Sequence, residues 1–414
     1  MVLVLIAKER EPEPRVSATP ETVKQMVGLG LEVEVERGAG AGSFIADTAF
    51  EAAGAKLVDP AARWADADLV LRVRGPEGPD DPGVKQLKPG AGLIAFITPH
   101  KHLDLVRFLL EAKVSCLAME LVPRITRAQK MDALSSQANI AGYKAVLMAA
   151  ARLPKYFPLL MTAAGTVKPA RVVVMGAGVA GLSAIATARR LGAVVEASDI
   201  RPAAKEQVMS LGAKFIEPPA LEGGGEGEGG YAKEVGADYL KRQQVVVAEH
   251  CAQADVVITT ALVPGRPAPV LLTRQTVEKM RPGSIVVDLA VEAGGNCELA
   301  RSGEDVVHNG VTILGESNIP GTMAGDASLL YARNVYALVH HLVKDKALVY
   351  DLEDEVTLGT LLTHDGDVIH AATRDLLGGA AKVAAKPEPG AVAEQASEDN
   401  DDTDSEQTSG EAAL

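Results

Sequence analysis

The stretch Arg171-Val-Val-Val-Met-Gly-Ala-Gly-Val-Ala-Gly181 decides the fold class of this chain. An apolar, strand-like run leads into the pattern Gly-x-Gly-x-x-Gly, and a helical pattern follows over residues 182–191. The glycine pattern alone is weak evidence, but the order strand, turn and helix is the context that dinucleotide binding requires. Gly176 allows a tight turn, Gly178 lets a pyrophosphate approach backbone N–H groups, and Gly181 lets helix and strand pack closely. The stretch therefore predicts a doubly wound α/β sheet that binds a dinucleotide.

The strand after this turn predicts which dinucleotide binds. Asp199 ends that strand, 18 residues after the last glycine of the turn. A carboxylate at this place accepts hydrogen bonds from the adenosine ribose hydroxyls and repels a 2′-phosphate, which favours NAD over NADP. Arg201 weakens the preference, because a nearby arginine can accept a phosphate. Thr260 and Leu262 follow a later strand, where small residues either contact the adenosine or serve packing alone.

Strand-like and helical patterns alternate along most of the chain, which predicts mostly parallel sheets. The first series of strand-like runs covers residues 2–7, 31–36, 69–73, 92–98 and 115–119, with a helix at 20–29. The second series covers six runs, at residues 172–175, 194–198, 214–216, 256–260, 284–289 and 312–314. We therefore expect an α/β protein with two Rossmann-like, doubly wound parallel-sheet domains and a cleft between them, in which NAD binds.

Two long helical patterns, at residues 135–153 and 327–342, would connect the domains, so the first domain would be discontinuous. Strand-like pieces at 348–352 and 358–370 surround Asp365-Gly366, which is a hairpin signal. The expected first domain comprises residues 1–134 and about 328–377, and the NAD-binding domain comprises residues 135–327. Residues 378–414 are rich in Ala, Glu, Asp, Ser and Pro and are expected to form a disordered acidic tail.

The polar loop at residues 123–137 bears on what the bound NAD does. Arg124, Gln129, Asp132 and Ser135 lie within twelve residues of each other. These groups are suited to hold a nicotinamide and its ribose, and the loop offers no obvious general base for an alcohol or an amine. The alternative is a polar helix start, in which Asp132 acts near the N-terminus of the helix.

Charge and cysteine content exclude several classes of function. The net charge is −14, and residues 387–414 contain nine acidic residues and no basic ones, which argues against a nucleic-acid partner. Cys116, Cys251 and Cys297 are far apart and form no Cys-x-x-Cys motif. They are expected to be small buried side chains in a reducing cytosol, and neither a zinc site nor a disulfide framework is predicted. The N-terminus is too short in apolar residues for a signal peptide, and no apolar window is long enough to span a membrane.

Two other segments leave alternatives open. Residues 221–230 are mostly glycine and glutamate and cannot form a packed element. They are either a variable surface insertion or a lid that closes over the cofactor, with Tyr231 at its base. His100 and His102 flank a lysine after a strand-like run, and they are either a solvated loop or acid/base residues.

At these motifs the chain resembles the alanine dehydrogenase and transhydrogenase superfamily, and most of all the NAD-binding first component of proton-translocating NAD(P) transhydrogenase. The resemblance covers about residues 1–375 and includes the loop at 123–137. Its other pieces are Lys8-Glu9 with Glu13-Pro-Arg15-Val-Ser-Ala-Thr-Pro20, Pro158-Leu-Leu-Met-Thr-Ala-Ala-Gly-Thr166, Val291-Glu-Ala-Gly-Gly-Asn296 and Asp326-Ala-Ser328.

The resemblance implies roles for single residues. In that family, the residues matching Arg124, Gln129, Asp132 and Ser135 position the nicotinamide end of NAD(H), and these four are the predicted catalytic residues. Tyr231 matches a tyrosine of a mobile loop that closes on the nucleotide. The predicted cofactor-binding residues are Arg127, Gly176, Gly178, Val179, Ala180, Gly181, Asp199, Ile200, Arg201, Gly230, Tyr231, Gln243, Thr260 and Leu262. No metal site is predicted.

The resemblance also implies a reaction and partners. Hydride transfer between two nicotinamides needs no general acid or base, so catalysis would consist of holding the rings at near-attack distance, roughly 3–3.5 Å. The chain has one fingerprint, so NADP(H) would be held by a partner subunit attached to membrane-spanning proton-channel subunits. The acidic tail implies that those membrane helices lie on separate chains. A homodimer in the bacterial cytoplasm, held at the inner face of the membrane by its partners and without direct membrane insertion, is expected.

Two alternatives remain. An amino-acid dehydrogenase such as alanine dehydrogenase uses a lysine and a histidine where this chain has Arg74 and Thr98, with His100 two residues on. Arg15, which could bind a substrate carboxylate, is retained. The other alternative is a catalytically silent NAD-binding module, against which the intact polar loop argues.

Overall fold

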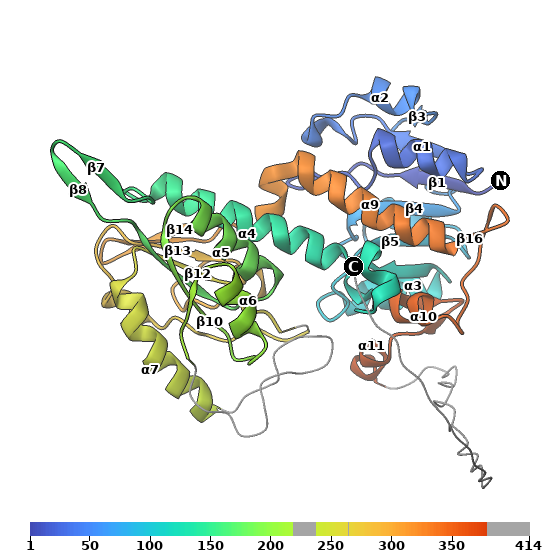
Figure 1. The fold of residues 1–414 in the computed structure, drawn as a ribbon. Helices are drawn as coiled ribbons and strands as arrows, with labels where there is room; N and C mark the ends of the chain where they lie inside the picture. The colour runs from blue at the N-terminus through green and yellow to red at the C-terminus, as the bar shows by residue number, and fades with distance from the viewer. Residues whose placement is uncertain (218–236, 264, 379–414) are drawn as a thin grey trace, which may run out of the picture. The chain divides into compact units, whose positions relative to one another are not determined.

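The computed structural model describes residues 1–217, 237–263 and 265–378, with the backbone alone described at residues 237–241 and 243. Two main sheets organise these residues, one of eight strands and one of seven (Figure 1). We call each sheet with its covering helices a lobe. Most strand pairs in both sheets are parallel, so the predicted fold class is confirmed.

The first sheet has the strand order β19-β18-β6-β5-β4-β1-β2-β3. Its strands are β1 (Leu3–Ile6), β2 (Glu32–Glu36), β3 (Lys56–Val58), β4 (Leu69–Arg74), β5 (Gly92–Phe96), β6 (Ser115–Ala118), β18 (Leu361–His364) and β19 (Asp367–Val368). Strands β1 to β6 run parallel, whereas β18 pairs antiparallel with β6 and with β19. The first sheet therefore takes strands from both ends of the described chain.

Side chains alternate between the two faces of the first sheet. Val4 lies in one apolar core and the adjacent Leu5 lies in the other. Helices α1 (Pro20–Gly28) and α9 (Ala324–Leu342) pack in the core with Val4, and α3 (Leu103–Glu111) packs in the core with Leu5. The shorter helices of this lobe are α2 (Asp47–Ala52), α10 (Glu355–Thr360) and α11 (Ala371–Leu376).

The second sheet has the order β11-β10-β9-β12-β13-β15-β14. Its strands are β9 (Arg171–Met175), β10 (Val194–Ser198), β11 (Lys214–Phe215), β12 (Val256–Thr259), β13 (Ile285–Asp288), β14 (Asp305–His308) and β15 (Val311–Leu314). Apart from β14, the strands are parallel and follow the 3-2-1-4-5-6 order of dinucleotide-binding sheets. Helices α4 (Ala133–Arg152), α5 (Val179–Arg190) and α6 (Ala204–Ser210) pack on one face, and α7 (Ala237–Gln253) and α8 (Arg274–Glu278) pack on the other.

Helix α4 belongs to both lobes. Its first residue, Ala133, is buried in the core of the first sheet, whereas Ala145 and Ala149 are buried in the core of the second. Its early turns also pack against α9, so the two long helices expected to connect the sheets lie in contact (Figure 1). This arrangement makes α4 the element that can carry a residue of one lobe to a fixed place relative to the other.

Several elements differ from the sequence predictions. Strand β14 was not predicted; it pairs antiparallel with β15 at the sheet edge, where alternate side chains are exposed and the apolar signal is weak. Residues 358–360 are helical and not part of a strand, because the Asp354 side chain accepts hydrogen bonds from the backbone of Val356 and Thr357 and caps α10. The hairpin at Asp365-Gly366 is confirmed, with positive φ at both residues.

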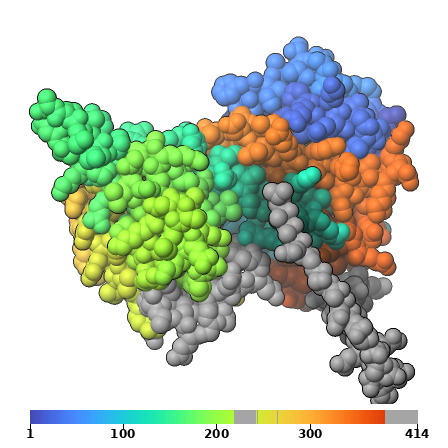
Figure 2. All heavy atoms as spheres, viewed as in Figure 1, coloured from blue at the N-terminus to red at the C-terminus, as the bar shows by residue number. Residues whose placement is uncertain are grey.

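A second hairpin, β7 (Leu160–Thr162) with β8 (Gly165–Val167), was also not predicted. It extends from the chain after α4 and projects from the surface (Figure 2). Leu159 and Met161 are 54% and 75% exposed, which is unusual for apolar side chains of this size. Among the described residues, no helix combines the length and apolar composition that crossing a membrane requires.

Candidate functional site

The glycine turn connects β9 to α5 at the carboxyl edge of the second sheet. Gly176 has a φ of +99°, and a Cβ there would lie 2.5 Å from Oγ1 of Thr260. A Cβ at Gly181 would lie 1.9 Å from the carbonyl oxygen of Gly176. At Gly178, which precedes the first residue of α5, a Cβ would meet no atom within 4 Å beyond its chain neighbours. The first and third glycines are therefore required by packing, and the second leaves open space at a helix N-terminus, where an anion binds favourably.

Asp199 follows β10 and is only 7% exposed. Its Oδ2 accepts a hydrogen bond of 2.7 Å from the backbone nitrogen of Ala177 and one of 2.9 Å from Nη2 of Arg201. Its Oδ1 accepts from the backbone nitrogen and Nε of Arg201 at 2.9 Å and 3.0 Å. Burial would raise the pKa of this carboxyl, but the hydrogen bonds of Arg201 and Ala177 hold it below its usual value. The structure thus brings Asp199 onto the glycine turn and directs Arg201 to the carboxylate.

Other residues of the predicted cofactor set surround this turn. Thr260 follows β12, and its hydroxyl donates to the carbonyl oxygen of Gly176 at 3.0 Å. The following residue, Ala261, is held by Asn296, whose Oδ1 accepts from the Ala261 nitrogen and whose Nδ2 donates to the Ala261 oxygen, both at 2.9 Å. Val179 and Leu262 are exposed, and Ala180 and Ile200 are half-buried. Asn296 was not predicted as a site residue; its signal was the family motif in which it stands.

The polar loop becomes a short 3₁₀ helix, η4 (Thr126–Met131), which leads directly into α4. Asp132 is the N-cap of α4: Oδ1 accepts from the Ser135 backbone nitrogen at 2.9 Å, and Oδ2 accepts from the Ser135 hydroxyl at 2.6 Å. The helix-start interpretation of Asp132 is therefore confirmed as structure. The same two hydrogen bonds fix the carboxylate and the hydroxyl in one orientation, as a group that positions a ligand requires.

The remaining loop residues point outward. Arg124 and Gln129 are exposed. Arg127, also exposed, donates from Nη1 to Oδ2 of Asp354 at 2.5 Å and lies 4.0 Å from Glu355. Burial alone would raise the pKa of the Asp354 carboxyl, but backbone hydrogen bonds, Arg127 and His341 hold it far below its usual range. Arg127, a predicted cofactor-binding residue, is thus paired with the cap of α10 in this structure.

Helix α9 holds the loop in place. Asn334 donates from Nδ2 to the carbonyl oxygen of Lys130 at 2.9 Å and accepts from the Ser136 hydroxyl at 2.7 Å. Gln137 donates from Nε2 to the carbonyl oxygen of Ala327 at 3.0 Å. The loop that carries the predicted catalytic residues is therefore anchored to a buried helix.

Helix α4 brings this loop and the glycine turn together. The Ser183 hydroxyl of α5 donates to the carbonyl oxygen of Asn139 at 2.8 Å, and a Cβ at Gly142 would lie 2.0 Å from the carbonyl oxygen of Ala180. Asn139 lies seven residues after Asp132, which is two turns or about 10 Å along the helix. The cap that holds Ser135 and the helix that follows the glycine turn are therefore fixed on one rigid element.

Glu13 is a buried hub that the sequence did not reveal. Its Oε1 accepts from Nε of Arg15 at 2.7 Å, and its Oε2 accepts from Nη2 of Arg15 at 2.7 Å, from Nε of Arg74 at 2.9 Å and from Nδ2 of Asn318 at 3.0 Å. Burial would raise the pKa of Glu13, but Arg15 and Arg74 hold it below its usual value. Arg15 is 5% exposed and also donates to Gln137, so it serves structure.

The strand end at Thr98 has a different environment. Thr98 has a φ of +53°, and its backbone nitrogen and that of Ile97 donate to the carboxylate of Glu120. Burial raises the pKa of Glu120. His102 contacts the carbonyl oxygen of Glu77 at 2.8 Å, and His100 is exposed, with a pKa lowered by partial burial and by Lys101.

Three predicted residues lie outside the described part of the structure. Gly230 and Tyr231 fall among residues 218–236, and the side chain of Gln243 is not described. The lid prediction for residues 221–230 falls there too. The three cysteines are buried and free, as their isolation in the sequence predicted.

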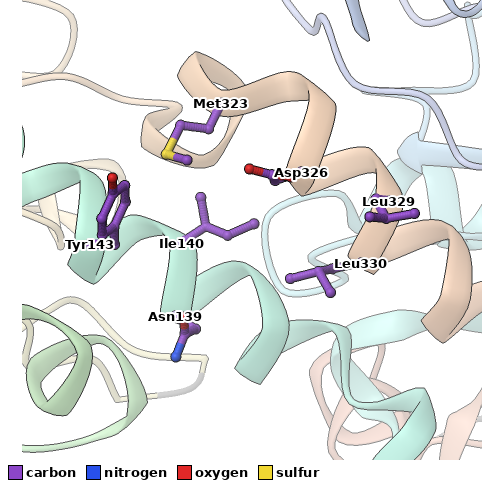
Figure 3. A pocket seen from close by; sticks show the side chains of 7 residues that line it. All are labelled: Asn139, Ile140, Tyr143, Met323, Asp326, Leu329 and Leu330. Carbon is purple, nitrogen blue, oxygen red and sulfur yellow. The ribbon is translucent and has the colours of Figure 1, made fainter. Parts of the chain in front are cut away.

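A pocket of about 330 Å³ lies between α4 and α9 (Figure 3). It is lined by Asn139, Ile140, Tyr143, Met323, Asp326, Leu329 and Leu330. None of the predicted site residues lines it. The predicted site is formed by the glycine turn and the loop on α4 and not by this pocket.

The described residues fit a dinucleotide. Gly178 leaves space at the N-terminus of α5, Asp199 offers a carboxylate at the end of the second strand, and Thr260 borders the turn. Fixed polar groups on the α4 cap stand two helical turns away. The observations that carry the fit are the two crowded glycines, because they keep the turn tight around an uncrowded third.

Comparisons with known proteins agree with this geometry. The family model "Alanine dehydrogenase/PNT, N-terminal domain" matches residues 5–141, and "Alanine dehydrogenase/PNT, C-terminal domain" matches residues 145–371. The first section of the split NAD(P) transhydrogenase subunit alpha of Rhodospirillum rubrum is 51% identical over 379 residues, which cover 89% of this chain and 98% of that protein.

Two further relatives mark the limits of the likeness. A crystal structure of transhydrogenase from Sinorhizobium meliloti is 50% identical with a TM-score of 0.79, and the match covers 88% of this chain and 99% of that one. Alanine dehydrogenase of Halomonas elongata is 31% identical over 389 residues, covering 91% of this chain and 96% of that protein. The family context supports binding of a nucleotide cofactor. The chain belongs to the alanine dehydrogenase/PNT family and, within it, to the NAD(P) transhydrogenase alpha subunits.

Proposed function

We propose that this chain binds NAD(H) and exchanges hydride directly with NADP(H) held by a partner subunit. The observation that carries the proposal is the α4 cap, where Asp132 and Ser135 hold each other rigidly on the helix that α5 packs against. When NADH is bound, its nicotinamide supplies a hydride, and the acceptor nicotinamide takes it up with no proton released. The protein residues then have one task, which is to fix ring geometry.

Roles can be assigned to the residues on this basis. Asp132 accepts hydrogen bonds that fix Ser135, and the two together present a carboxylate and a hydroxyl in a set orientation. Gln129 and Arg124 are exposed at the same end of α4 and would contact the nicotinamide end of the nucleotide. The space at Gly178 would receive the pyrophosphate, and Asp199 would accept from the adenosine ribose.

Asp199 also supports the choice of NAD(H) over NADP(H) for this chain. A buried carboxylate whose pKa is held low stays charged at neutral pH and repels a 2′-phosphate. Arg201 donates three hydrogen bonds to that carboxylate, so its charge is directed away from a second phosphate. NADP(H) would accordingly be bound by the partner.

The test is hydride transfer between nucleotides. The purified chain should bind NADH more tightly than NADPH, and with an NADP-binding subunit of a related complex it should pass hydride between NADH and NADP⁺. The isolated chain should produce no NADH from L-alanine and NAD⁺. Robust alanine-dependent NADH formation by the isolated chain would replace this proposal with the amino-acid dehydrogenase.

A structural observation bears on that second candidate. A dehydrogenase acting on an amino acid needs a free cation for the substrate carboxylate. Both Arg15 and Arg74 are already paired with Glu13. The amino-acid dehydrogenase is therefore the weaker candidate, and a non-catalytic module would leave the fixed Asp132–Ser135 pair without a task.

We also propose the organisation of the complex. The first domain would comprise residues 1–134 and about 328–377, the NAD-binding domain residues 135–327, and the tail residues 378–414; the two sheets support this division. The chain would act in the bacterial cytoplasm at the inner face of the membrane, held there by membrane-spanning proton-channel subunits, so that hydride transfer is coupled to proton translocation.

A homodimer is proposed because the hairpin exposes apolar side chains that an isolated pair of strands cannot bury alone. Met161→Glu on β7 should shift the protein towards monomer in sedimentation equilibrium. An exposed apolar residue far from the hairpin provides the control, and Met209→Glu should leave the assembly unchanged. A monomeric wild-type chain would contradict the dimer.

A further inference from the structure

Arg74 connects the two lobes. It is the last residue of β4, and its Nη2 donates to Oε1 of Glu292 at 3.4 Å. Glu292 lies in the 3₁₀ helix η6 (Val291–Ala293), which follows β13. Both residues therefore stand just beyond the carboxyl ends of parallel strands, one in each sheet, which is where ligands bind in such sheets.

The two contacts of Arg74 differ in strength. Towards the first lobe, Nε donates at 2.9 Å to Glu13, whose side chain is 2% exposed. Towards the second lobe, the contact with Glu292 is longer, and the Glu292 side chain is 53% exposed. Charge pairs in water are weaker than buried ones and are screened by salt. Arg74 is thus fixed to its own lobe and reversibly attached to the other.

Two further hydrogen bonds cross between the lobes at the same place. Nζ of Lys101, in the loop after β5, donates to the carbonyl oxygen of Glu292 at 3.0 Å. Nδ2 of Asn318, which precedes a core residue of the second lobe, donates to Glu13 at 3.0 Å. Glu13 and Glu292 are therefore each contacted from the opposite lobe, and Arg74 contacts both.

From Glu292, a series of contacts leads to the glycine turn. Four residues after Glu292, the side chain of Asn296 holds both the nitrogen and the oxygen of Ala261. The neighbouring Thr260 donates to the carbonyl oxygen of Gly176. A change in the turn when the pyrophosphate binds would be felt at Glu292 through this short path.

From Arg74, a second series of contacts leads to the predicted nicotinamide loop. Glu13 binds Arg15, and Nη1 of Arg15 donates to Oε1 of Gln137 at 2.8 Å. Gln137 lies on α4, two residues after Ser135. The Arg74–Glu292 contact is thus the point where a network from the glycine turn meets a network from the α4 cap.

We propose that Arg74 is a positioning residue for hydride transfer: by pairing with Glu292 across the lobes, it sets the separation at which the loop and the glycine turn act on one bound nucleotide. This inference rests on the proposed function for its catalytic readout. Spatial continuity of contacts does not by itself establish coupling, so the measurement must be a coupling between the two residues.

The experiment is a double-mutant cycle on the full-length chain with Arg74→Gln, Glu292→Gln and both together. Two quantities are measured: the Kd for NADH by fluorescence, and the rate of hydride transfer to NADP⁺ on an NADP-binding subunit. Each single variant should weaken NADH binding by about two- to fivefold, as expected for loss of an exposed ion pair. Each should slow hydride transfer by about tenfold, since geometry is lost as well as affinity.

The double variant should be no worse than the worse single variant, because the second substitution removes a contact already broken. The rate of wild-type hydride transfer should fall as ionic strength rises, and that of Glu292→Gln should change less. Arg333→Gln is the matched control. It breaks a similarly exposed 2.9 Å pair with Glu21, outside the network, and should change neither quantity.

Additive effects of the two substitutions, or equal losses in binding and in rate, would overturn the positioning role. If Arg74→Gln does not fold, Glu292→Gln and its salt dependence decide the question, because Glu292 is exposed. If the wild-type chain transfers no hydride with the partner subunit, the proposed function fails. The cycle on NADH affinity then still decides whether the two residues are coupled.

Discussion

Gly142 of α4 faces the carbonyl oxygen of Ala180 in α5, and a Cβ at Gly142 would lie 2.0 Å from that oxygen. The contact fixes the first turn of α5, which begins at the glycine turn, against the helix that carries the Asp132 cap. A glycine inside a helix normally lowers its stability, so its place here is explained by the close approach of two helices.

Gly142→Ala should therefore destabilise the protein, by about 1–3 kcal/mol, because the new methyl group forces the two helices apart. Intrinsic helix propensity predicts the opposite sign, a gain of roughly 0.5–1 kcal/mol. NADH affinity should fall as well, since the N-terminus of α5 moves. The free energy of unfolding from urea titration and the NADH Kd are the measurements.

Gly28→Ala serves as the control for that substitution. Gly28 is the last residue of α1, and a Cβ there would meet no atom within 4 Å. This variant should gain about 0.4–1 kcal/mol because the unfolded chain loses freedom. A gain in stability for both variants would show that the Gly142–Ala180 contact is unimportant.

Asp132→Asn should slow hydride transfer by about ten- to a hundredfold while NADH Kd changes less than about threefold. Asparagine caps a helix nearly as well as aspartate, so the free energy of unfolding should change little. Asp132→Ala, in contrast, removes the cap and should cost about 1 kcal/mol in stability. Gln129→Ala should show the same separation of rate and affinity without any loss of the cap.

Comparison of rate and affinity decides between the two roles of Asp132. If Asp132→Asn lowers rate and affinity equally, the carboxylate contributes general binding and does not position the nicotinamide. If only Asp132→Ala is impaired, and in proportion to its loss of stability, the cap is purely structural.

Asp199→Ser should change the nucleotide preference. The carboxylate that repels a 2′-phosphate would be absent, and the three hydrogen bonds that hold Arg201 would be reduced. NADH affinity should fall and NADPH affinity should rise, each by about tenfold. Titrations of both nucleotides test this, with Asp199→Ser/Arg201→Ala as the control that should lose the gain in NADPH affinity.

Glu9 predicts a pH dependence of stability. Burial raises its pKa from 4.5 to about 7, although Arg72 and the backbone nitrogens of Val73 and Arg74 lower it. The folded protein therefore favours the protonated form. The stability from this group is complete below about pH 4.5 and is lost as pH rises through about 7, a change on the order of 3 kcal/mol.

Glu9→Gln cannot titrate, so its free energy of unfolding should fall less than that of the wild type between about pH 5 and about pH 8. Urea titrations at both pH values measure the difference. Identical slopes for the two proteins would mean that Glu9 stays charged in the folded state, stabilised by Arg72.

The sequence predicted the elements whose signals are local. The glycine turn at Gly176 and the hairpin at Asp365-Gly366 depend on backbone conformations that adjacent residues specify, so both could be predicted. The exposed edge strand β14 has weak apolar alternation and was missed. Residues 358–360 looked like a strand because they are apolar and precede one, but the cap at Asp354 begins a helix there.

The contacts that hold the candidate site together are non-local, and the sequence does not contain them in readable form. Glu13 receives donors from Arg15, Arg74 and Asn318, the last of which lies 305 residues away. Gly142 looked like an ordinary residue of an Ala-rich helix until α5 was seen against it. Roles for Gln129 and Asp132 came from family resemblance, and these remain predictions.

The first sheet has a consequence for how the protein is made. Its edge strand β18 and its covering helix α9, with the fully buried Tyr331, emerge from the ribosome only after the entire second sheet. The second lobe can fold during synthesis, while the early strands β1 to β6 still lack one of their helices and a neighbour for β6. A nascent chain that stops before residue 324 should therefore bind chaperones through its N-terminal third, and the earliest part of the polypeptide should be the last to become resistant to protease.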